Sequence, residues 1–298
     1  MTSVAQLIKQ GFSKAFDKYL YDELVIGKLA HHEAKTIAKK GDEVDIKMPA
    51  MVTLFDYDGG DLPTAEKVDT SFVKVKIDRG AGVHFTMSQI EEDFIKNSKS
   101  DVDQAALIRE YTSDAVKQFA AKVDTAYGNL YTRAGHYLDD SGSAIELTAQ
   151  TAKDILAYMQ AKFQRGDGKG HTNWIDGQML AIVPPEYQFY LGKLEDLKYT
   201  ESGKKEQRKG YIGTLCGWDI LVSNNIASPS SNVYYPLFGL ASKTLAGGMS
   251  NDLNMQDYVP EKNFDRTYKG YGLFGVGAPR ADFLGTVKIS APLTLTTT

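Results

Sequence analysis

Apolar residues recur every three or four positions over residues 4–39, which is the spacing of one face of an amphipathic helix. The clearest of them are Ile8, Phe12, Ala15, Phe16, Tyr19 and Leu20. The register blurs near Gly27, and the run Lys39-Lys40-Gly41 is a helix stop signal. We therefore expect a helical N-terminal arm over residues 1–41, with a break near Gly27.

The period of the pattern then changes to two. Two sets of apolar residues alternate with polar ones, namely Val44, Ile46 and Met48, and then Val73, Val75 and Ile77. They predict two strands joined by a linker of about 20 residues, which is too long for a tight turn. Because an isolated two-stranded ribbon is marginal in water, this extended β-loop over residues 42–80 requires a partner surface.

A long helical stripe follows the loop. Its apolar residues lie on one face and are Val116, Phe119, Ala120, Val123, Tyr127, Leu130 and Tyr131. Ser100 and Asp103 form a capping pair at its start, and Gly135 is a stop signal at its end. A helix over residues 102–134 is about 50 Å long at ~1.5 Å per residue, which is long enough to support a whole domain.

The second half of the chain mixes both periods. Thr151-x-x-Asp154 predicts a capped helix that ends at Gly166, and residues 200–210 predict a mobile basic loop. A hairpin with its turn at Cys216-Gly217 is expected next. The other predicted elements are a buried strand at Met179–Val183, a short helix at Tyr187–Leu194, and late strands at Thr267–Phe274 and Phe283–Ile289.

Composition restricts the class of protein. The 298 residues are 42% hydrophobic, and 34 Lys and Arg against 38 Asp and Glu give a net charge of -4. A globular core is expected, and a uniformly basic face for wrapping nucleic acid is excluded. One cysteine, Cys216, excludes an internal disulfide. The N-terminus lacks the pattern of a secretion signal and no stretch reaches ~18 apolar residues, so we expect a soluble protein.

Short motifs that suggest ligands fail on spacing. His31-His32-Glu33 lacks the second histidine of a zinc-protease helix, because position 36 is Thr. The Gly166–Gly170 run follows a helix and lacks the Ser or Thr of a phosphate loop. Asp56–Asp61 has the glycine and glutamate of a calcium loop at the wrong offsets, although a cation bridging subunits there stays an alternative.

No pattern predicts a catalytic site. The chain has no Gly-x-Ser-x-Gly elbow, Cys216 has no nearby histidine in the sequence, and adjacent carboxylates such as Glu91-Glu92 point apart. The glycines of residues 210–217 lack the G-x-G-x-x-G spacing, and the β-rich run Trp218–Val222 behind them favours a hairpin. We assign no catalytic, cofactor or metal residue, and a small-molecule enzyme is the alternative of another class.

The order of these elements resembles the major capsid proteins of tailed bacteriophages, which have the HK97-type fold. The local matches are Gly217-Trp-Asp-Ile-Leu-Val-Ser-Asn224 after Gly210-Tyr-Ile-Gly213, the stretch Leu180–Tyr187, and Phe264–Gly272. The resemblance covers nearly the whole chain. It implies an α+β fold with an N-terminal arm (1–41), an extended β-loop (42–80), a peripheral domain with the spine helix (81–145), an axial domain (146–241), and a return to the peripheral domain with the tail (242–298).

The resemblance also implies a function. The chain is expected to be a structural protein, not an enzyme, that self-assembles as hexamers and pentamers into the icosahedral shell of a phage head. The shell encloses double-stranded DNA without sequence-specific contact, forms in the cytoplasm of a bacterial host and becomes part of the virion. A separate scaffolding protein and a portal protein are implied partners, a decoration protein is allowed, and no membrane is involved. An encapsulin-like nanocompartment is the alternative within the same fold.

Assembly requires surface that neighbouring subunits bury. The apolar face of the extended loop gains burial at roughly 25 cal/mol per Å² only when a neighbour covers it. The candidate interface residues are Val44, Ile46, Met48, Phe55, Tyr57, Phe72, Val73, Val75 and Ile77 in the loop, Phe12, Phe16 and Leu20 in the arm, and Lys204 and Arg208 in the basic segment.

Overall fold

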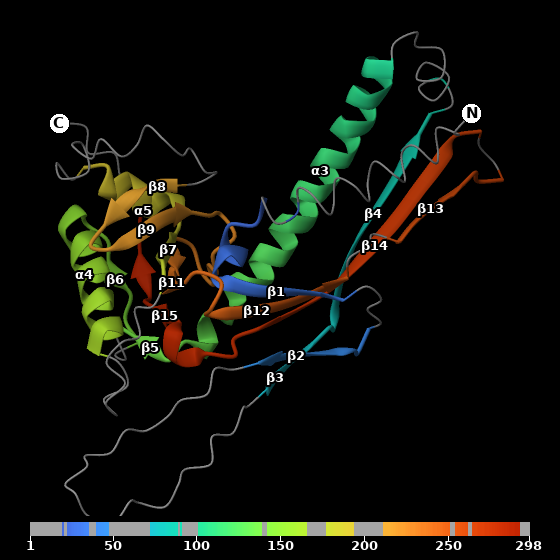
Figure 1. Cartoon of the computed structure of the whole chain (residues 1–298). Helices are drawn as coiled ribbons and strands as arrows, with labels where there is room; N and C mark the ends of the chain where they lie inside the picture. Colours follow the sequence, from blue (N-terminus) through green and yellow to red (C-terminus); the bar gives the residue numbers. More distant parts are fainter. Residues whose placement is uncertain are drawn as a thin grey trace, which may run out of the picture.

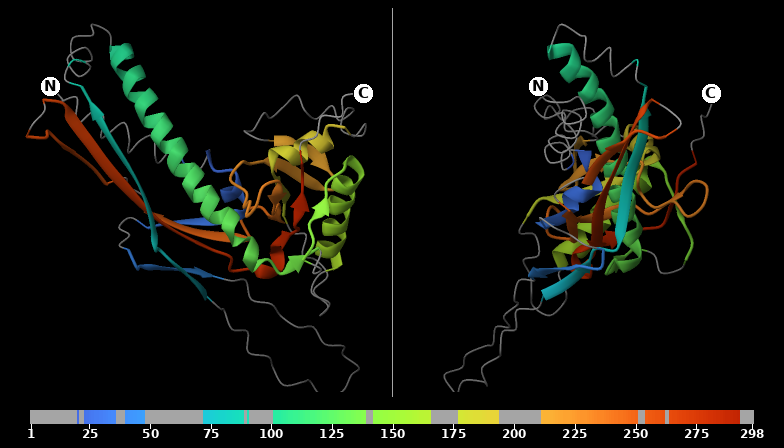
Figure 2. Two further views of the ribbon diagram at one scale, coloured as in Figure 1. Left: turned by 180° about the vertical axis from the view of Figure 1, so that it is seen from behind. Right: turned by 90° about the vertical axis from the view of Figure 1, so that its right-hand side faces the viewer.

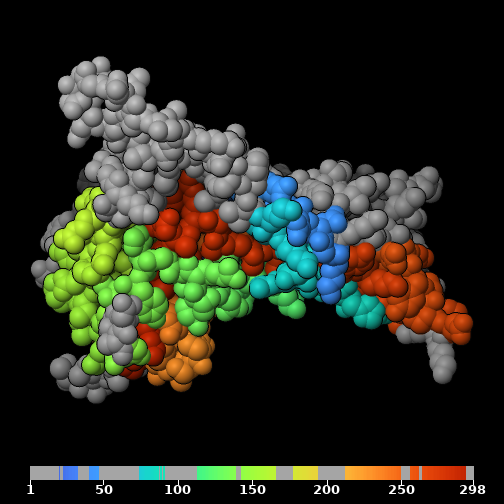
Figure 3. Space-filling model, turned by 90° about the horizontal axis from the view of Figure 1, so that it is seen from below, coloured from blue at the N-terminus to red at the C-terminus, as the bar shows by residue number. Residues whose placement is uncertain are grey.

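The computed structural model describes residues 20, 23–35, 40–47, 72–88, 90, 101–138, 142–165, 177–193, 211–250, 254–261 and 264–292. Over these residues the chain is a mixed α+β protein, which confirms the predicted fold class. A long β-sheet and a long helix make one end of the molecule, and a more compact lobe makes the other (Figure 1). The elongated outline is also visible from below (Figure 3).

The long sheet, called the blade below, is built around one twelve-residue strand. Its strands are β1 (Ala30–Lys35), β4 (Arg79–Met87), β12 (Leu245–Ser250), β13 (Asn254–Tyr258) and β14 (Arg266–Gly277). On one side β14 pairs antiparallel with the whole of β4. On its other side it pairs with β13 toward the free end of the blade and with β12 toward the lobe. The predicted strand at Thr267–Phe274 is therefore confirmed and is longer than expected.

Helix α3 (Asp101–Gly128) lies along one face of the blade (Figure 2). Its 28 residues span about 42 Å at ~1.5 Å per residue. The chain then tightens into the 3₁₀ helix η2 (Asn129–Arg133), so the predicted long helix is confirmed with an irregular last turn. Val123 and Tyr127 are fully buried in its apolar stripe, and the Phe119 ring meets the Phe274 ring edge-on at 5.8 Å. The helix thereby closes one face of the blade.

The lobe has a six-stranded sheet in the order β5-β15-β11-β7-β9-β8 and a three-stranded sheet in the order β10-β16-β6. The strands are β5 (His136–Tyr137), β6 (Ile145–Glu146), β7 (Met179–Val183), β8 (Tyr211–Leu215), β9 (Trp218–Val222), β10 (Val233–Tyr234), β11 (Leu237–Leu240), β15 (Gly285–Thr286) and β16 (Ile289–Ser290). Helices α4 (Ala149–Arg165) and α5 (Pro185–Leu191) pack on them, and the 3₁₀ helix η5 (Ala281–Phe283) precedes β15.

Two buried aromatic residues tie the lobe sheet to α4. The Trp218 Nε1–H donates to the Leu156 carbonyl at 3.0 Å, and the Tyr187 hydroxyl donates to the Ala152 carbonyl at 2.7 Å. Both residues are fully buried. Because their only polar groups are paired, the large rings contribute apolar burial without leaving an unsatisfied donor.

The predicted hairpin is confirmed as β8 and β9. The two turn residues, Cys216 and Gly217, have φ values of 49° and 72°. Positive φ at both central residues is the mark of a turn whose twist matches that of the flanking strands. The glycines of this stretch therefore serve backbone geometry.

The cap of α4 lies three residues before the predicted one. The Thr148 hydroxyl accepts from the Thr151 N–H at 3.1 Å, while the Thr151 hydroxyl accepts from the Thr148 N–H at 2.7 Å. This reciprocal pair has the geometry of a capping box with Thr in place of Glu at the third helical position. The helix begins at Ala149 and ends at Arg165, so its predicted end is confirmed.

The predicted N-terminal helix is wrong beyond Leu24. Residues Ile26–Leu29 form the 3₁₀ helix η1, and Ala30–Lys35 form strand β1, which pairs parallel with β12. The partner of Ala30 is Leu245, more than 200 residues away by sequence number. Pairing at that separation leaves no periodicity in the local sequence. The helical spacing of the residues before Leu24 therefore does not continue into residues 26–35.

The extended loop forms the predicted ribbon, in which β2 (Glu43–Lys47) pairs antiparallel with β3 (Phe72–Lys76). The inward side chains are Val44, Ile46, Val75 and Ile77. They pack against Ala246 and Leu273 in the blade of the same chain. Glycines make this approach possible, because a Cβ at Gly275 would overlap the Lys76 carbonyl and a Cβ at Gly248 would lie 2.9 Å from a Val44 methyl. The expectation that only a neighbouring subunit covers this face is therefore wrong for the described part of the ribbon.

The five predicted domain ranges stay a prediction, but the sheets divide the chain more finely. The chain passes from the blade to the lobe after η2, where β5 joins the six-stranded sheet. It returns to the blade at β12 and leaves again after β14, because β15 and β16 both lie in the lobe. The late strand predicted at Phe283–Ile289 is in fact these two short strands. The predicted linker of the loop, the cap at Ser100 and the basic loop at residues 200–210 lie outside the described residues.

Candidate subunit interface

The predicted interface residues divide into three groups. Leu20, Val44, Ile46, Val75 and Ile77 are buried within the chain, at 7% exposure or less. Phe72 and Val73 lie in β3, where they pair with Lys47 and Ile46. The remaining candidates lie outside the described residues and are Phe12, Phe16, Met48, Phe55, Tyr57, Lys204 and Arg208.

The outward face of the ribbon is charged. The Lys74 Nζ lies 3.0 Å from a Glu43 carboxylate oxygen, and this hydrogen bond raises the pKa of Lys74. Lys74 and Asp45 also face each other in the strand register. An exposed ion pair of this kind contributes little to stability because water screens it. The described part of the ribbon thus presents a hydrated face outward and keeps its apolar face inside.

Exposed apolar side chains gather instead at the free end of the blade. Within the described residues the large exposed apolar side chains are Ile90, Tyr158, Tyr258, Val259, Phe264 and Tyr271. Four of these six lie on β13, β14 or the connection between them. We call Tyr258, Val259, Phe264 and Tyr271 the distal patch. Ile90 follows β4, whose last residue Met87 pairs with Arg266 at the same end of the sheet.

Strand alternation places part of the distal patch on the face away from α3. Along β14, Tyr268, Gly270 and Gly272 are buried while Lys269 and Tyr271 are exposed. Phe274 shares the buried face and contacts Phe119 of α3. Because side chains alternate between faces in a strand, Lys269 and Tyr271 point to the opposite side.

Neighbouring polar groups hold one ring of the patch. The Tyr258 hydroxyl lies 3.4 Å from His84 Nε2, and the Lys269 Nζ lies 5.3 Å from the centre of the Tyr258 ring. Nearby, an Arg266 guanidinium nitrogen pairs with an Asp257 carboxylate oxygen at 2.7 Å. Cross-strand contacts of this kind restrict the free end of the hairpin, so the patch is presented by an ordered surface.

A buried carboxylate fixes the base of the N-terminal arm to α3. Asp124 is 1% exposed, and its two oxygens accept the N–H groups of Val25 at 2.8 Å and Gly27 at 3.0 Å. Burial raises the pKa of Asp124 against these hydrogen bonds, which lower it. The Gly27 carbonyl in turn lies 2.8 Å from Nε2 of His32, whose pKa burial lowers. Both backbone polar groups of Gly27 are thus held by side chains. No spacing in the sequence marked this site.

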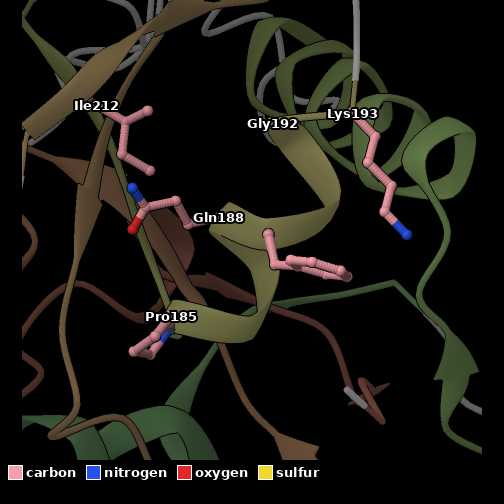
Figure 4. A pocket seen from close by; sticks show the side chains of 6 residues that line it. Pro185, Gln188, Gly192, Lys193 and Ile212 are labelled. Carbon is pink, nitrogen blue, oxygen red and sulfur yellow. The ribbon is translucent and has the colours of Figure 1, made fainter. Parts of the chain in front are cut away.

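A hollow of about 620 Å³ lies beside α5. It is lined by Pro185, Gln188, Phe189, Gly192, Lys193 and Ile212. Figure 4 shows Gln188 beside Ile212, with Lys193 on the other side of the helix turn. The Lys193 Nζ lies 4.4 Å from the centre of the Phe189 ring, which is a cation–π contact. This lining holds no pair of titratable groups that would exchange a proton.

In the described part of the chain, no three His, Cys, Asp or Glu side chains come together in a way that suits a metal ion. No helix among these residues combines the length and apolar character needed to span a membrane.

Known proteins resemble this chain in structure but not detectably in sequence. No protein-family model and no curated protein sequence matches the chain. A structure from Mycobacterium phage Che8 is similar with a TM-score of 0.60 and 20% identity, over 89% of this chain and 90% of that one.

Two further structures are similar over the same extent. The mature capsid of bacteriophage PhiM1 gives a TM-score of 0.56 at 16% identity, over 89% of this chain and 87% of that one. The SrpI encapsulin of Synechococcus elongatus gives 0.56 at 10% identity, over 91% and 89%. Matches of whole chains at such low identity establish a shared architecture. The chain therefore has the HK97-type capsid fold.

Proposed function

We propose that this chain is the major capsid protein of a tailed phage, which assembles into the icosahedral shell of the head. The supporting observation is the extent of the structural match. About nine tenths of this chain aligns with about nine tenths of subunits from phage capsids, with no large part left over on either side. A fold alone does not define a function, but here nearly the whole subunit aligns on both sides.

A shell is stabilised by apolar surface that is buried at each contact between subunits. Contacts that each bury several hundred Å² of apolar area contribute many kcal/mol at roughly 25 cal/mol per Å², less the cost of ordering the partners. A closed shell repeats the same contacts around every hexamer and pentamer. The elongated subunit, with a blade at one end and a lobe at the other, offers separate surfaces for such contacts.

The proposed content of the shell is double-stranded DNA. The net charge of -4 suits a wall that encloses DNA without gripping it, because strong phosphate contacts would hinder packing and release. A separate scaffolding protein, a portal protein and, on the outside, a decoration protein are the proposed partners. Assembly takes place in the cytoplasm of a bacterial host, and the mature shell is part of the virion.

An encapsulin-like nanocompartment is the second candidate. The similarity to the SrpI encapsulin, at a TM-score of 0.56, is as high as that to the PhiM1 capsid. The two candidates differ in what the shell holds. Genes for a terminase, a portal and a scaffold beside this gene support the phage, whereas a cargo enzyme with a targeting tail supports the nanocompartment.

A role in catalysis is not proposed. The hollow beside α5 lacks paired titratable groups, and buried groups with shifted pKa values, such as Asp124 and His32, hold the backbone of the arm. Perturbed groups with a structural partner of this kind indicate a fold constraint more than an active site.

Electron microscopy of the expressed protein tests the proposal. The chain is produced alone and together with the scaffold from the same gene cluster, and each preparation is examined by negative stain. Closed particles or curved sheets are the expected result. Compact monomers that persist in both preparations would contradict the shell function. Removal of residues 55–70 from the loop is expected to leave a folded subunit that no longer assembles.

A further inference from the structure

We propose that the hollow beside α5 is the docking site of residues 293–298 of the same chain. These residues have the sequence Leu-Thr-Leu-Thr-Thr-Thr and lie outside the described residues, which end at Pro292. The inference does not depend on the proposed shell function, because the hollow and the segment belong to one subunit.

The last described residues bring the chain to the side of α5. After β16 ends, the Ala291 N–H donates to the Asn232 carbonyl at 2.8 Å, and the Tyr190 hydroxyl donates to the Pro292 carbonyl at 2.6 Å. Tyr190 belongs to α5, so residues 293–298 begin beside the helix that lines the hollow. At about 3.3 Å per residue the six residues reach about 20 Å, which is more than the diameter of a helix.

Two aromatic rings and a lysine connect Tyr190 to the hollow. The Lys193 Nζ lies 5.3 Å from the centre of the Tyr190 ring and 4.4 Å from that of the Phe189 ring. The two rings meet edge-on at 5.5 Å, and both Phe189 and Lys193 line the hollow. Figure 4 shows Lys193 at one side of this lining. The point where the described chain ends and the hollow therefore lie on adjacent faces of one helix.

A buried carboxylate oxygen without a donor lies on the same side of α5. The Glu186 Oε1 accepts the Tyr234 hydroxyl at 2.8 Å, whereas Glu186 Oε2 is buried and has no hydrogen-bond partner among the described residues. Burying an acceptor without a donor is unfavourable, so a donor is expected there. Glu186 and Tyr190 are four residues apart on the helix and share a face. The backbone N–H groups that follow Pro292 are donors that can reach this place.

The lining of the hollow suits a short uncharged segment. Its apolar surface comes from Pro185, Phe189 and Ile212, and the Gln188 side chain offers an amide that can bond to a peptide group. Lys193 is the one charged residue of the lining, and its charge already contacts two rings.

The sequence of residues 293–298 matches that lining. Leu293 and Leu295 alternate with threonines, which is the pattern of an extended segment with one apolar side. The segment carries no charged side chain. Residues 194–210, which also adjoin α5, carry nine charged side chains, so burial in this hollow is less favourable for them.

Hydrogen exchange of the full-length free subunit tests the docking. The proteins are wild type, Gln188→Trp, Glu186→Gln and Gln164→Trp. Gln188→Trp fills the hollow from an exposed position, and the control Gln164→Trp makes the same change at an exposed position of α4. Glu186→Gln keeps an acceptor for Tyr234 and replaces the other oxygen with an amide that cannot accept a hydrogen bond.

The amides of residues 293–298 are expected to exchange at least about tenfold more slowly in wild type than in a free peptide of that sequence. Gln188→Trp and Glu186→Gln are each expected to remove most of this protection, and Gln164→Trp none of it. Thermal melting checks that each variant is folded. Deletion of residues 293–298 gives a second readout without any substitution in the hollow, because the amides of α5 are then expected to exchange faster.

Four results would overturn the inference. The first is an unprotected segment in wild type, and the second is protection that neither hollow variant changes, since the segment is then held elsewhere. Protection that is lost on dilution assigns the hollow to the segment of a neighbouring copy. Faster exchange only in residues 194–210 of Gln188→Trp assigns it to those residues. None of these results bears on shell formation, which microscopy tests separately.

Discussion

The substitution Gly247→Ala adds one methyl group and tests how closely helix α3 packs against the blade. Gly247 lies in β12, between His32 of β1 and Val276 of β14. A Cβ at this position would approach the Tyr127 hydroxyl to well under the 3.0 Å that Cβ atoms keep from their neighbours. The Tyr127 side chain is fully buried on α3, so it has no free space into which to turn.

The expected loss of stability in Gly247→Ala depends on how little β12 and the Tyr127 side chain can move. Excess volume in a packed core costs about 1–3 kcal/mol, and the upper end applies where neither neighbour moves easily. Because β12 is paired on both edges and Tyr127 belongs to a long helix, we expect Gly247→Ala to lower the free energy of unfolding by about 3 kcal/mol. In a Tyr127→Phe background the nearest atom becomes Cζ at 3.1 Å, which is tight but tolerable. There the same substitution is expected to cost about 1 kcal/mol or less.

Denaturant unfolding of the free subunit measures this in a double-mutant cycle. The four proteins are wild type, each single variant and the double variant, and the expected coupling is about 2 kcal/mol. Gly192→Ala is the control, because its φ is -63° and its nearest neighbour is 3.4 Å away. Equal costs of Gly247→Ala in the two backgrounds would refute the reasoning, since the tyrosine hydroxyl would then not lie over the glycine.

Three further predictions concern anchors of the fold. Asp124→Ala removes the acceptor of the Val25 and Gly27 N–H groups at the start of η1 and is expected to lower the free energy of unfolding by about 2 kcal/mol. Faster hydrogen exchange at those amides would accompany it, and unchanged exchange would count against the anchor. Because burial lowers the pKa of His32 in the folded state below the 6.5 of the unfolded chain, its contribution to stability is fully present above pH 6.5 and is lost as the pH falls from there through the lower pKa of the folded state. Wild type is thus expected to lose more stability between about pH 7.5 and about pH 5.5 than His32→Gln, and parallel curves would argue otherwise. Thr148→Ala removes the cap of α4 and is expected to cost about 1 kcal/mol in thermal unfolding, so a loss near zero would show that the cap is dispensable.

Elements with a strong local signal could be predicted from the sequence. The apolar stripe of α3 and the alternation of Val44 and Ile46 in β2 each specify one element with one buried face. The turn at Cys216-Gly217 follows from residues that sit at the turn itself. Such features depend on neighbours along the chain, which is why the fold class and the ribbon were predicted correctly.

Features that depend on distant residues could not be predicted in this way. β1 exists because β12 lies beside it, and the ribbon is covered because Gly248 and Gly275 leave room for it on the blade. The exposed part of the outer face of β14 likewise begins where the ribbon ends, beyond Leu273. A strand rich in glycine and aromatic residues, as in Tyr268 to Gly277, is the available signal for a close approach, but it does not say what approaches.

The size of the purified protein in solution tests most directly whether copies of this chain close into a shell, as proposed. Sedimentation velocity, with electron microscopy of the fast fraction, separates a 32.9 kDa subunit from closed particles of many copies. A single fast boundary made of uniform round particles is the predicted result, with the scaffold present if the chain alone forms irregular sheets. A slow boundary at the mass of the subunit, under every condition and with the scaffold present, would contradict the account.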